Sequence, residues 1–185
     1  SGYAEMLKHG LISEEGHWAE LMTFDMDHPD YGKLQQLVGE SVQIKERIVA
    51  QDPFEQGIRK ALNLGHTIGH AFESFALERE APVLHGYAVA WGMVCELYLA
   101  HQKTGFPTDK MRQTVQFIKE NYGKLAFNCR DYDRLYEFMK HDKKNAAAGM
   151  INFTLLGGIG DIRINQTATK EEINEALDFY CETMG

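Results

Sequence analysis

The chain has 185 residues, 44% of them hydrophobic and 25% charged, and its formal net charge is −8 at pH 7. Such a composition is typical of one globular domain that buries a sizeable core. The negative charge and the lack of any basic run argue against a nucleic-acid partner. No apolar run approaches the ~18 residues of a membrane span and no signal peptide opens the chain, so we expect no membrane partner. The three cysteines lie far apart without CxxC spacing, which predicts reduced thiols in a cytoplasmic protein.

Hydrophobic periodicity and capping signals predict a mainly α, multi-helical domain with one small β-hairpin. The expected helices, in chain order, cover residues 2–12, a segment that starts at the N-cap Ser13 and ends before residue 25, 31–51, about 55–77, 85–103, 108–121, 131–142 and 169–184. Residues 143–149 are expected to form a loop. The hairpin is expected at residues 151–164, because the glycine-rich segment there is followed by a second strand-like segment rather than by the helix that a phosphate loop needs. The first helix begins almost without a lead-in, which suggests a piece of a longer protein.

The segment from Arg59 to His70, RKALNLGHTIGH, is the most informative part of the chain. Four polar residues recur on a regular spacing there: Arg59, Asn63, His66 and His70. On one continuous α-helix these positions would fall within about 60° of arc, where apolar residues normally bury a helix. The opposite side of the same helix is already apolar. We therefore predict a polar face that binds an anion, a metal, or both.

The spacing of the histidines is compatible with a metal site. His66 and His70 have the i, i+4 spacing of a zinc-binding HxxxH pair, but Thr67 replaces the glutamate that acts as the base in zinc peptidases. Glu5 and His85, at the start of other predicted helices, are further candidate ligands. Imidazole and carboxylate groups suit zinc or a similar divalent ion, and three protein ligands would leave a position open for catalysis. Spacing alone leaves the choice of three ligands open.

Several cations and one acid are candidates for binding a substrate. Arg59 can hold a carboxylate or phosphate with two parallel hydrogen bonds, whereas lysine acts as a point charge. Lys8 lies one turn after a glutamate on the first predicted helix, and Lys45 and the pair at 143–144 carry weaker signals. Glu55, four residues before Arg59, can serve as its ion-pair partner or as an acid–base group.

Together these segments resemble the C-terminal domain of the 3-dehydroquinate synthase family, which is one of the sugar phosphate cyclases. The matching blocks are SGYAEMLKHG at the start, residues 55–73 with NLGHTIGH, LHGYAVAWGM from Leu84, and DKK at 142–144 with the hairpin after it. They stand in family order over residues 1 to about 160, so the resemblance covers nearly the whole chain. NLGHTIGH is the most specific of them.

The resemblance implies a role for each candidate residue. It implies a divalent metal, zinc or alternatively cobalt, held by Glu5, His66 and His85, with His70 contacting the substrate instead. The implied substrate-site residues are Lys8, Lys45, Arg59, Asn63, His70 and Lys143, and we add Glu55 as a candidate catalytic residue. Arg59 and Lys45 would hold a carboxylate, while Asn63, His70 and Lys143 would face the phosphate and ring hydroxyls. Lys144 is the alternative to Lys143.

The resemblance also implies an activity, which is the conversion of 3-deoxy-arabino-heptulosonate 7-phosphate to 3-dehydroquinate and phosphate in the shikimate pathway of aromatic amino-acid biosynthesis. In this lyase reaction NAD oxidises one carbinol transiently, phosphate leaves, the ketone is reduced again and an aldol step closes the ring. Residues 1–185 would be the C-terminal metal- and substrate-binding domain, and the NAD-binding N-terminal domain is not among them. The chain alone is expected to be inactive, and the full-length protein to be a homodimer.

Two departures and three alternatives accompany this interpretation. Pro53 and Phe54 stand where family members usually carry two acids, and residues 78–84 form a longer connection than usual. The first alternative is another sugar phosphate cyclase that makes an inosose or a valiolone, whose substrate lacks the carboxylate that Arg59 would bind. The others are a metal-dependent polyol dehydrogenase and a non-catalytic, metal-stabilised interaction domain.

Overall fold

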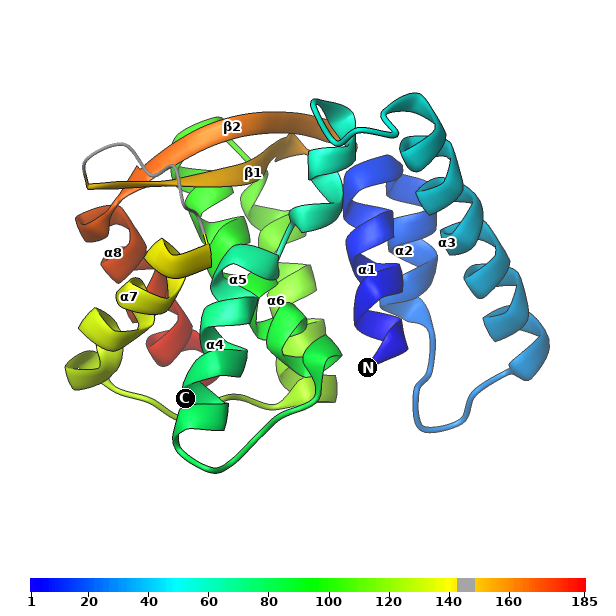
Figure 1. The fold of residues 1–185 in the computed structure, drawn as a ribbon. Coiled ribbons are helices and arrows are strands. Elements are labelled where there is room, and N and C mark those ends of the chain that lie inside the picture. Colours follow the sequence, from blue (N-terminus) through cyan, green and yellow to red (C-terminus); the bar gives the residue numbers. More distant parts are fainter. Residues whose placement is uncertain (143–148) are drawn as a thin grey trace.

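A computed structural model describes residues 1–142 and 149–185, and within them it contains eight α-helices, two short 3₁₀-helices and one antiparallel β-hairpin (Figure 1). The elements are α1 (Gly2–Ser13), α2 (Glu15–Thr23), α3 (Tyr31–Gln51), η1 (Ile58–Asn63), α4 (His66–Glu78), α5 (His85–Thr104), α6 (Thr108–Tyr122), η2 (Cys129–Asp131), α7 (Tyr132–Asp142), β1 (Met150–Gly158), β2 (Asp161–Thr169) and α8 (Lys170–Met184). The predicted mainly α fold with one hairpin is confirmed. Among the described residues no helix is long and apolar enough to cross a bilayer.

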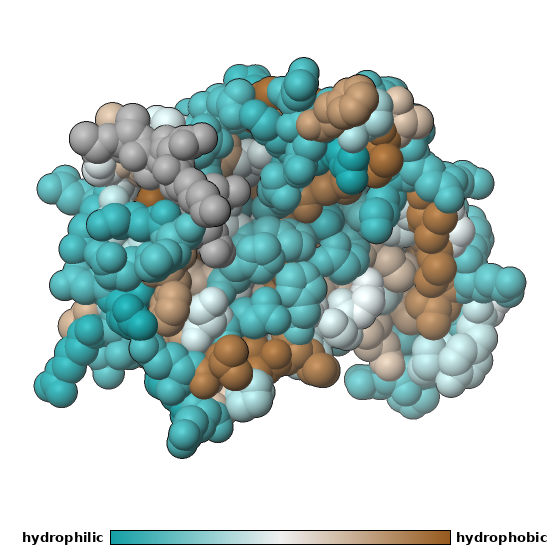
Figure 2. Space-filling model, viewed as in Figure 1, coloured by the Kyte–Doolittle hydropathy of each residue, from teal (hydrophilic) through white to brown (hydrophobic). Residues whose placement is uncertain are grey.

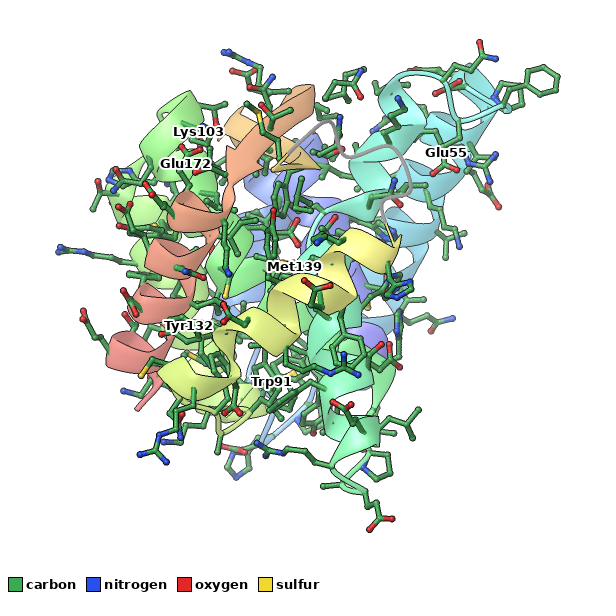
Figure 3. All side chains as sticks on the ribbon, turned by 60° about the vertical axis from the view of Figure 1, so that its left-hand side comes forward. Glu55, Trp91, Lys103, Tyr132, Met139 and Glu172 are labelled. Carbon is green, nitrogen blue, oxygen red and sulfur yellow. The ribbon has the colours of Figure 1, made fainter. Side chains whose placement is uncertain are left out.

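The helices form two groups under the hairpin. In Figure 1, α1 to α3 make one side of the molecule and α4 to α8 the other, and the hairpin lies across the end of α5. Helix α5 is the centre of the core, because it is buried along most of its length and contacts α1, α4, α6, α8 and β1. Figure 3 shows the Lys103–Glu172 ion pair, which joins the end of α5 to the first turn of α8 at 2.5 Å.

Local signals fixed the hairpin and the last helix almost as predicted. Thr169 and Glu172 form a reciprocal capping box at the start of α8. The strands are longer than expected and meet at Ile159–Gly160, where Gly160 has a φ of +81°. The predicted N-cap of α2 was one residue early, since Glu14 rather than Ser13 takes that position.

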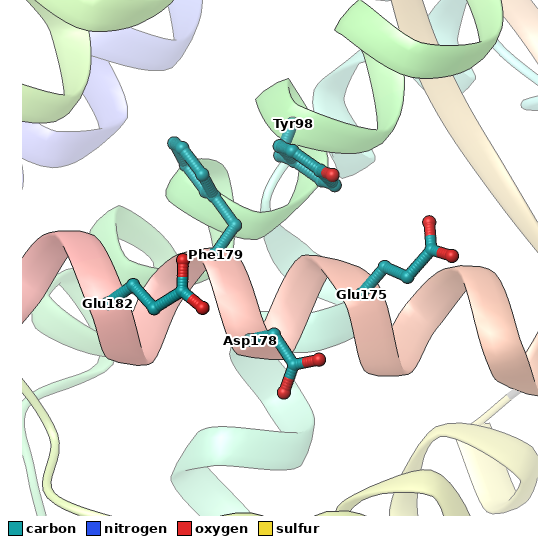
Figure 4. A pocket seen from close by; sticks show the side chains of 5 residues that line it. All are labelled: Tyr98, Glu175, Asp178, Phe179 and Glu182. Carbon is teal, nitrogen blue, oxygen red and sulfur yellow. The ribbon is translucent and has the colours of Figure 1, made fainter.

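The packing of α5 against α8 is aromatic inside and acidic outside. Tyr98 stacks on Phe179 with ring centroids 4.6 Å apart, and three carboxylates of α8 stand around this pair (Figure 4). One of them, Asp178, accepts a hydrogen bond of 2.7 Å from the Tyr132 hydroxyl. This contact ties α7 to α8.

The predicted continuous helix at about 55–77 is wrong. The Asp52 carboxylate accepts hydrogen bonds from the backbone N–H groups of Gln56, Gly57 and Arg59, at 3.0, 2.6 and 3.1 Å, and so closes a loop where the helix was expected to begin. A 3₁₀-helix follows, and Gly65 then interrupts the chain with a φ of +80°. Arg59 and Asn63 therefore do not share one α-helix face with the two histidines.

The break at Gly65 results from the close crossing of α4 and α5. A Cβ atom at Gly65 would lie 2.6 Å from Met93 Cγ and 2.9 Å from the Val89 oxygen, and one at Gly92 would lie 2.2 Å from the Gly65 oxygen. Only glycines allow the two backbones to approach this closely. The crossing brings the start of α4 next to the start of α5.

Candidate metal centre and substrate site

Three histidines converge where α4 and α5 begin. Candidate ligand atoms of His66, His70 and His85 all lie within 4.8 Å of one another. The ring centroid of His66 is 5.3 Å from that of His70 and 5.3 Å from that of His85, and the last two are 5.8 Å apart. One turn of α4 supplies the first two rings and the first residue of α5 supplies the third.

The Glu5 carboxylate on α1 faces the same point. Its Oε1 atom lies 3.4 Å from His66 Nε2 and 3.8 Å from His85 Nε2. Ligand atoms around a tetrahedral zinc ion are roughly 3.3 Å apart, given metal–ligand distances of about 2.0–2.1 Å. The donors therefore fit zinc or cobalt in both chemistry and separation.

Two overlapping ligand sets are available in this cluster. One is the predicted set of Glu5, His66 and His85, and the other replaces the carboxylate with His70. The predicted set joins three different helices and includes a carboxylate that faces two of the imidazoles. It remains our prediction, and the assignment of His70 to the substrate remains a prediction as well.

The hydrogen bonds of the imidazoles orient them toward Glu5. His66 Nδ1 lies 3.1 Å from the Leu64 carbonyl oxygen, which can only accept, so Nδ1 carries a proton. Nε2 of the same ring lies 3.4 Å from Oε1 of Glu5. A metal ion held by these residues would bind between the Glu5 carboxylate and this nitrogen.

Glu73 is a site residue to which sequence reasoning gave no role. Its Oε1 atom lies 3.0 Å from His85 Nδ1, which leaves Nε2 of that ring directed at Glu5. A carboxylate that accepts from the second nitrogen of a metal-binding histidine fixes the orientation of the ring and strengthens it as a ligand. Glu73 lies seven residues after His66 and therefore on the same face of α4, and this spacing is the sequence signal that could have identified it.

Glu96 is a second residue that the sequence did not reveal. It is completely buried in α5, and its carboxylate accepts from the backbone N–H groups of Gly65 and Ile68 at 3.0 and 3.1 Å. A negative charge at this place satisfies two N–H groups of the first turn of α4 and interacts favourably with the helix dipole. It holds His66 in position through the backbone.

Electrostatics keeps Glu5 ionised. Its Oε2 atom lies 2.5 Å from Nζ of Lys8, whose side chain is almost completely buried. Burial alone would raise the pKa of Glu5, but the hydrogen bond to His66 and the charge of Lys8 outweigh it and hold that pKa well below its usual range. Burial lowers the pKa of Lys8, Glu5 opposes this, and the charge of Lys45 adds to the lowering.

The structure gives contacts for some of the remaining predicted site residues but does not describe all of them. Arg59 lies on η1, where its Nη1 donates to the Pro53 oxygen at 2.8 Å, and Asn63 Nδ2 lies 3.4 Å from Glu55 Oε1. Asn63, rather than Arg59, is therefore the partner of Glu55, which has a positive φ of 54°. Figure 3 shows Glu55 beside the exposed turn that follows α3. Lys143 and its alternative Lys144 lie outside the described residues.

A family model described as 3-dehydroquinate synthase C-terminal matches residues 2–145. The chain belongs to the 3-dehydroquinate synthase family. A curated 3-dehydroquinate synthase from Parabacteroides distasonis is 61% identical over 185 residues, which are 100% of this chain and 52% of that protein. One from Bacillus pumilus is 35% identical and matches 96% of this chain and 48% of its own length. The chain thus spans about half the length of these 3-dehydroquinate synthases.

Solved structures of related cyclases share the fold of this 3-dehydroquinate synthase family member. A 2-deoxy-scyllo-inosose synthase, complexed with carbaglucose-6-phosphate, NAD⁺ and Co²⁺, superposes with a TM-score of 0.75 at 21% identity over 95% of this chain and 49% of its own. A 2-epi-5-epi-valiolone synthase from Streptomyces hygroscopicus subsp. jinggangensis, with NAD⁺ and Zn²⁺ bound, gives 0.74 at 21% identity over 98% and 50%.

Proposed function

We propose that this chain is the C-terminal half of a 3-dehydroquinate synthase, an NAD- and metal-dependent lyase that converts 3-deoxy-arabino-heptulosonate 7-phosphate to 3-dehydroquinate and phosphate. The observation that carries the proposal is the convergence of the Glu5 carboxylate and three imidazoles beside the buried Lys8. The 61% identity to a curated enzyme of that name supports the same activity.

In this proposal Glu5, His66 and His85 hold a divalent ion, zinc or cobalt. When bound, such an ion lowers the pKa of a coordinated hydroxyl and stabilises the alkoxide that gives up hydride. NAD supplies hydride transfer when it is bound. We propose that it binds to the half of the protein that lies outside this chain. The Glu5 carboxylate and Nε2 of the two oriented imidazoles already face one point, which favours the binding of a cation there.

The cations hold the anionic substrate in one pose. Lys8 is buried, and its charge offsets that of Glu5, with which it forms an ion pair. Arg59 is proposed to bind the substrate carboxylate with its planar guanidinium, together with Lys45. Fixing the substrate in this way favours the intramolecular steps of elimination and ring closure, because the reacting groups are already held in the required orientation.

A second group of polar residues is proposed to bind the other end of the substrate. Asn63 and His70 are proposed to contact the phosphate side and the ring hydroxyls, and Lys143 to join them. Glu55, 3.4 Å from Asn63 Nδ2, orients that amide and is a candidate acid–base group. We further propose that the full-length protein forms a homodimer, which light scattering on the full-length protein tests.

The test is product identity from the full-length protein with zinc and NAD. Heptulosonate phosphate should yield phosphate and 3-dehydroquinate, whereas glucose 6-phosphate should yield no cyclised product. An inosose or valiolone product would instead identify another sugar phosphate cyclase.

Arg59→Ala distinguishes the proposal from a non-catalytic domain. Loss of the charged contact to the substrate should reduce kcat/KM by at least roughly 10- to 100-fold, because even one charged hydrogen bond contributes about 1.5–3 kcal/mol. Arg79→Ala is the matched control, because that exposed arginine lies over Phe75 at the far end of α4. Unchanged turnover in Arg59→Ala would contradict the assignment of this residue.

A further inference from the structure

The first turn of α5 contains a buried backbone N–H group that its own helix does not satisfy. Gly86 is buried and stands second in the helix, directly after His85. An N–H group at this position has no carbonyl partner within the helix. The N-cap of α5 is Leu84, whose side chain has no atom that could accept from the turn. The N–H group of Gly86 therefore needs an acceptor from another part of the chain, because a buried and unpaired N–H costs free energy.

Ser1 supplies that acceptor. The Gly86 N–H donates to the Ser1 Oγ at 2.9 Å, across 85 positions of the sequence. Ser1 is also the N-cap of α1, where its backbone oxygen accepts from the Ala4 N–H at 3.1 Å and its hydroxyl makes no capping bond. One residue thus caps two helices, α1 through its carbonyl group and α5 through its side chain.

The closeness of this contact gives a reason for the glycine after His85. A Cβ atom at Gly86 would lie 2.5 Å from the Ser1 Cα and nearer still to both Ser1 oxygens. Two of these three atoms belong to the backbone, so a side chain at position 86 would displace the start of α1 rather than rotate a flexible group aside. Gly86 is therefore the residue that lets Ser1 reach α5.

The contact joins the two segments that carry Glu5 and His85. Glu5 lies about one turn after Ser1 on α1, and His85 directly precedes Gly86. The Glu5 Oε1 and His85 Nε2 atoms are 3.8 Å apart. This separation depends on how the beginnings of the two helices are placed, and the Ser1–Gly86 hydrogen bond connects these beginnings directly.

The connection before α5 lies mostly on the surface. Leu77 and Leu84, on either side of it, are 66% and 63% exposed, and Figure 2 shows a hydrophobic patch near the lower end of α4. Val83 is partly buried against the core. A surface connection of this kind restrains the next helix weakly. Glu73 fixes the direction of the His85 ring, but the position of the His85 backbone depends on the first turn of α5.

We propose that Ser1 is a positioning residue of the metal centre, which sets the separation of Glu5 and His85 through its hydrogen bond to the Gly86 N–H. The inference rests on the proposed function only in taking Glu5 and His85 as metal ligands. Without the hydroxyl, the first turn of α5 opens in a larger fraction of the molecules. Because the ion binds with full affinity only where this turn is formed, the apparent affinity falls with the fraction that is competent.

Zinc titration of the metal-free full-length protein tests this role. Ser1→Ala should bind Zn²⁺ roughly 3- to 30-fold more weakly than the wild type, which is the factor that corresponds to the loss of an N-cap hydrogen bond. Thr169→Ala is the matched control, because it also removes an N-cap hydroxyl that accepts from a backbone N–H, but at the start of α8. It should lower the free energy of unfolding and leave the affinity for Zn²⁺ unchanged. Ser1→Thr keeps the hydroxyl on an exposed residue and should restore most of the affinity.

Gly86→Ala tests the contact from its other side. The added methyl group displaces Ser1, so Zn²⁺ binding should weaken at least as much as in Ser1→Ala. The Ser1→Ala, Gly86→Ala double variant should bind no more weakly than Gly86→Ala alone, because the two changes remove the same contact. Losses that simply add would show two independent effects and would overturn the proposal.

The remaining outcomes also decide the inference, and none depends on turnover. Equal weakening of Zn²⁺ binding in Ser1→Ala and Thr169→Ala would show a general effect of stability and overturn it. Unchanged Zn²⁺ binding in Ser1→Ala would overturn it and leave the metal centre intact. A full-length protein that lacks synthase activity but loses Zn²⁺ affinity selectively in Ser1→Ala would refute the proposed activity and support the role of Ser1.

Discussion

A different carboxylate lies beside each ring nitrogen of His85, and this decides which nitrogen can bind a metal ion. Glu73 accepts from Nδ1 at 3.0 Å, while Nε2 points to Glu5 at 3.8 Å. His66 is oriented in the same way, because its Nδ1 contacts the backbone carbonyl of Leu64 instead of a carboxylate. Each ring is therefore locked into one tautomer and one orientation before any cation binds, which lowers the cost of forming the site.

Removing the Glu73 carboxylate should weaken metal binding without unfolding the protein. Glu73→Gln should reduce the affinity for Zn²⁺ by roughly 10- to 100-fold, the usual effect of losing such an outer partner. Calorimetric titration of the metal-free protein with Zn²⁺ measures this. Glu78→Gln on the same helix, which breaks an exposed ion pair with Arg134, should leave the affinity unchanged. Equal affinities in all three proteins would exclude the proposed role of Glu73.

His9 makes the domain sensitive to acid. It is buried beside Ser41, with Nδ1 2.5 Å from the hydroxyl oxygen, and burial together with the charge of Lys8 lowers its pKa from 6.5 to about 4. As the pH falls from about 6.5 to 4, the unfolded chain takes up the proton first, so the free energy of unfolding decreases by at most about 3 kcal/mol. Glu5, whose pKa is depressed in the folded state, extends the loss below pH 4.5.

Urea unfolding at several pH values tests the contribution of His9. His9→Asn keeps a polar group near Ser41 but does not titrate, so its stability should change less between pH 7 and pH 4.5 than that of the wild type. His28→Asn is the control, since that side chain is 87% exposed, and its profile should follow the wild type. Parallel profiles for His9→Asn and the wild type would rule out His9 as the source of the acid sensitivity.

The crossing of α4 and α5 is the structural element that forms the site. Gly92 lets the two helices touch, because a Cβ there would lie 2.2 Å from the Gly65 oxygen and 2.6 Å from the Gly69 nitrogen. Both clashes are with backbone, which cannot move aside like a flexible side chain. The same contact region contains the Glu96 carboxylate, so helix packing and the cap of α4 depend on each other.

Gly92→Ala should therefore destabilise the chain and disturb the metal centre together. We expect a loss of about 1–3 kcal/mol in the free energy of unfolding, as for other overpacked cores, and weaker Zn²⁺ binding. Gly39→Ala in α3, where a Cβ would meet nothing within 4 Å, should instead stabilise the helix by about 0.5–1 kcal/mol. Denaturant midpoints of the two variants give the comparison. A Gly92→Ala midpoint equal to that of the wild type would show that the crossing tolerates a methyl group.

The same element shows where sequence reasoning succeeds and fails. The α8 cap and the start of α5 at His85 were predicted, because both depend on neighbouring residues in the sequence. The break at Gly65 was not, since it is imposed by contacts with α5 residues that lie more than twenty positions away. Spacing alone also could not choose among the metal ligands, because three helices bring them together. The family resemblance named Glu5, and the structure then placed it beside the histidines.

At the scale of the whole molecule, the proposed metal ligands all lie within this chain, whereas the proposed catalytic site also needs residues outside it. All three proposed metal ligands and the carboxylate that orients His85 lie within this chain. The curated relatives are about twice as long. We propose that the NAD site and the other wall of the substrate site lie in residues outside this chain. Metal binding and turnover should therefore separate when this chain is produced by itself.

We expect the 185-residue chain to bind one equivalent of Zn²⁺ and to show no turnover. Glu5, His66 and His85 suffice for the metal, whereas hydride transfer needs the NAD that the remaining half would hold. Metal analysis after gel filtration gives the stoichiometry, and a Glu5→Gln variant, which loses one ligand charge, should retain less zinc. Phosphate release from heptulosonate phosphate, with Zn²⁺ and NAD present, should stay at the level of the protein-free blank and appear with the full-length protein. Turnover by the chain alone would mean that these residues contain the whole active site and that the proposed division between two halves is wrong.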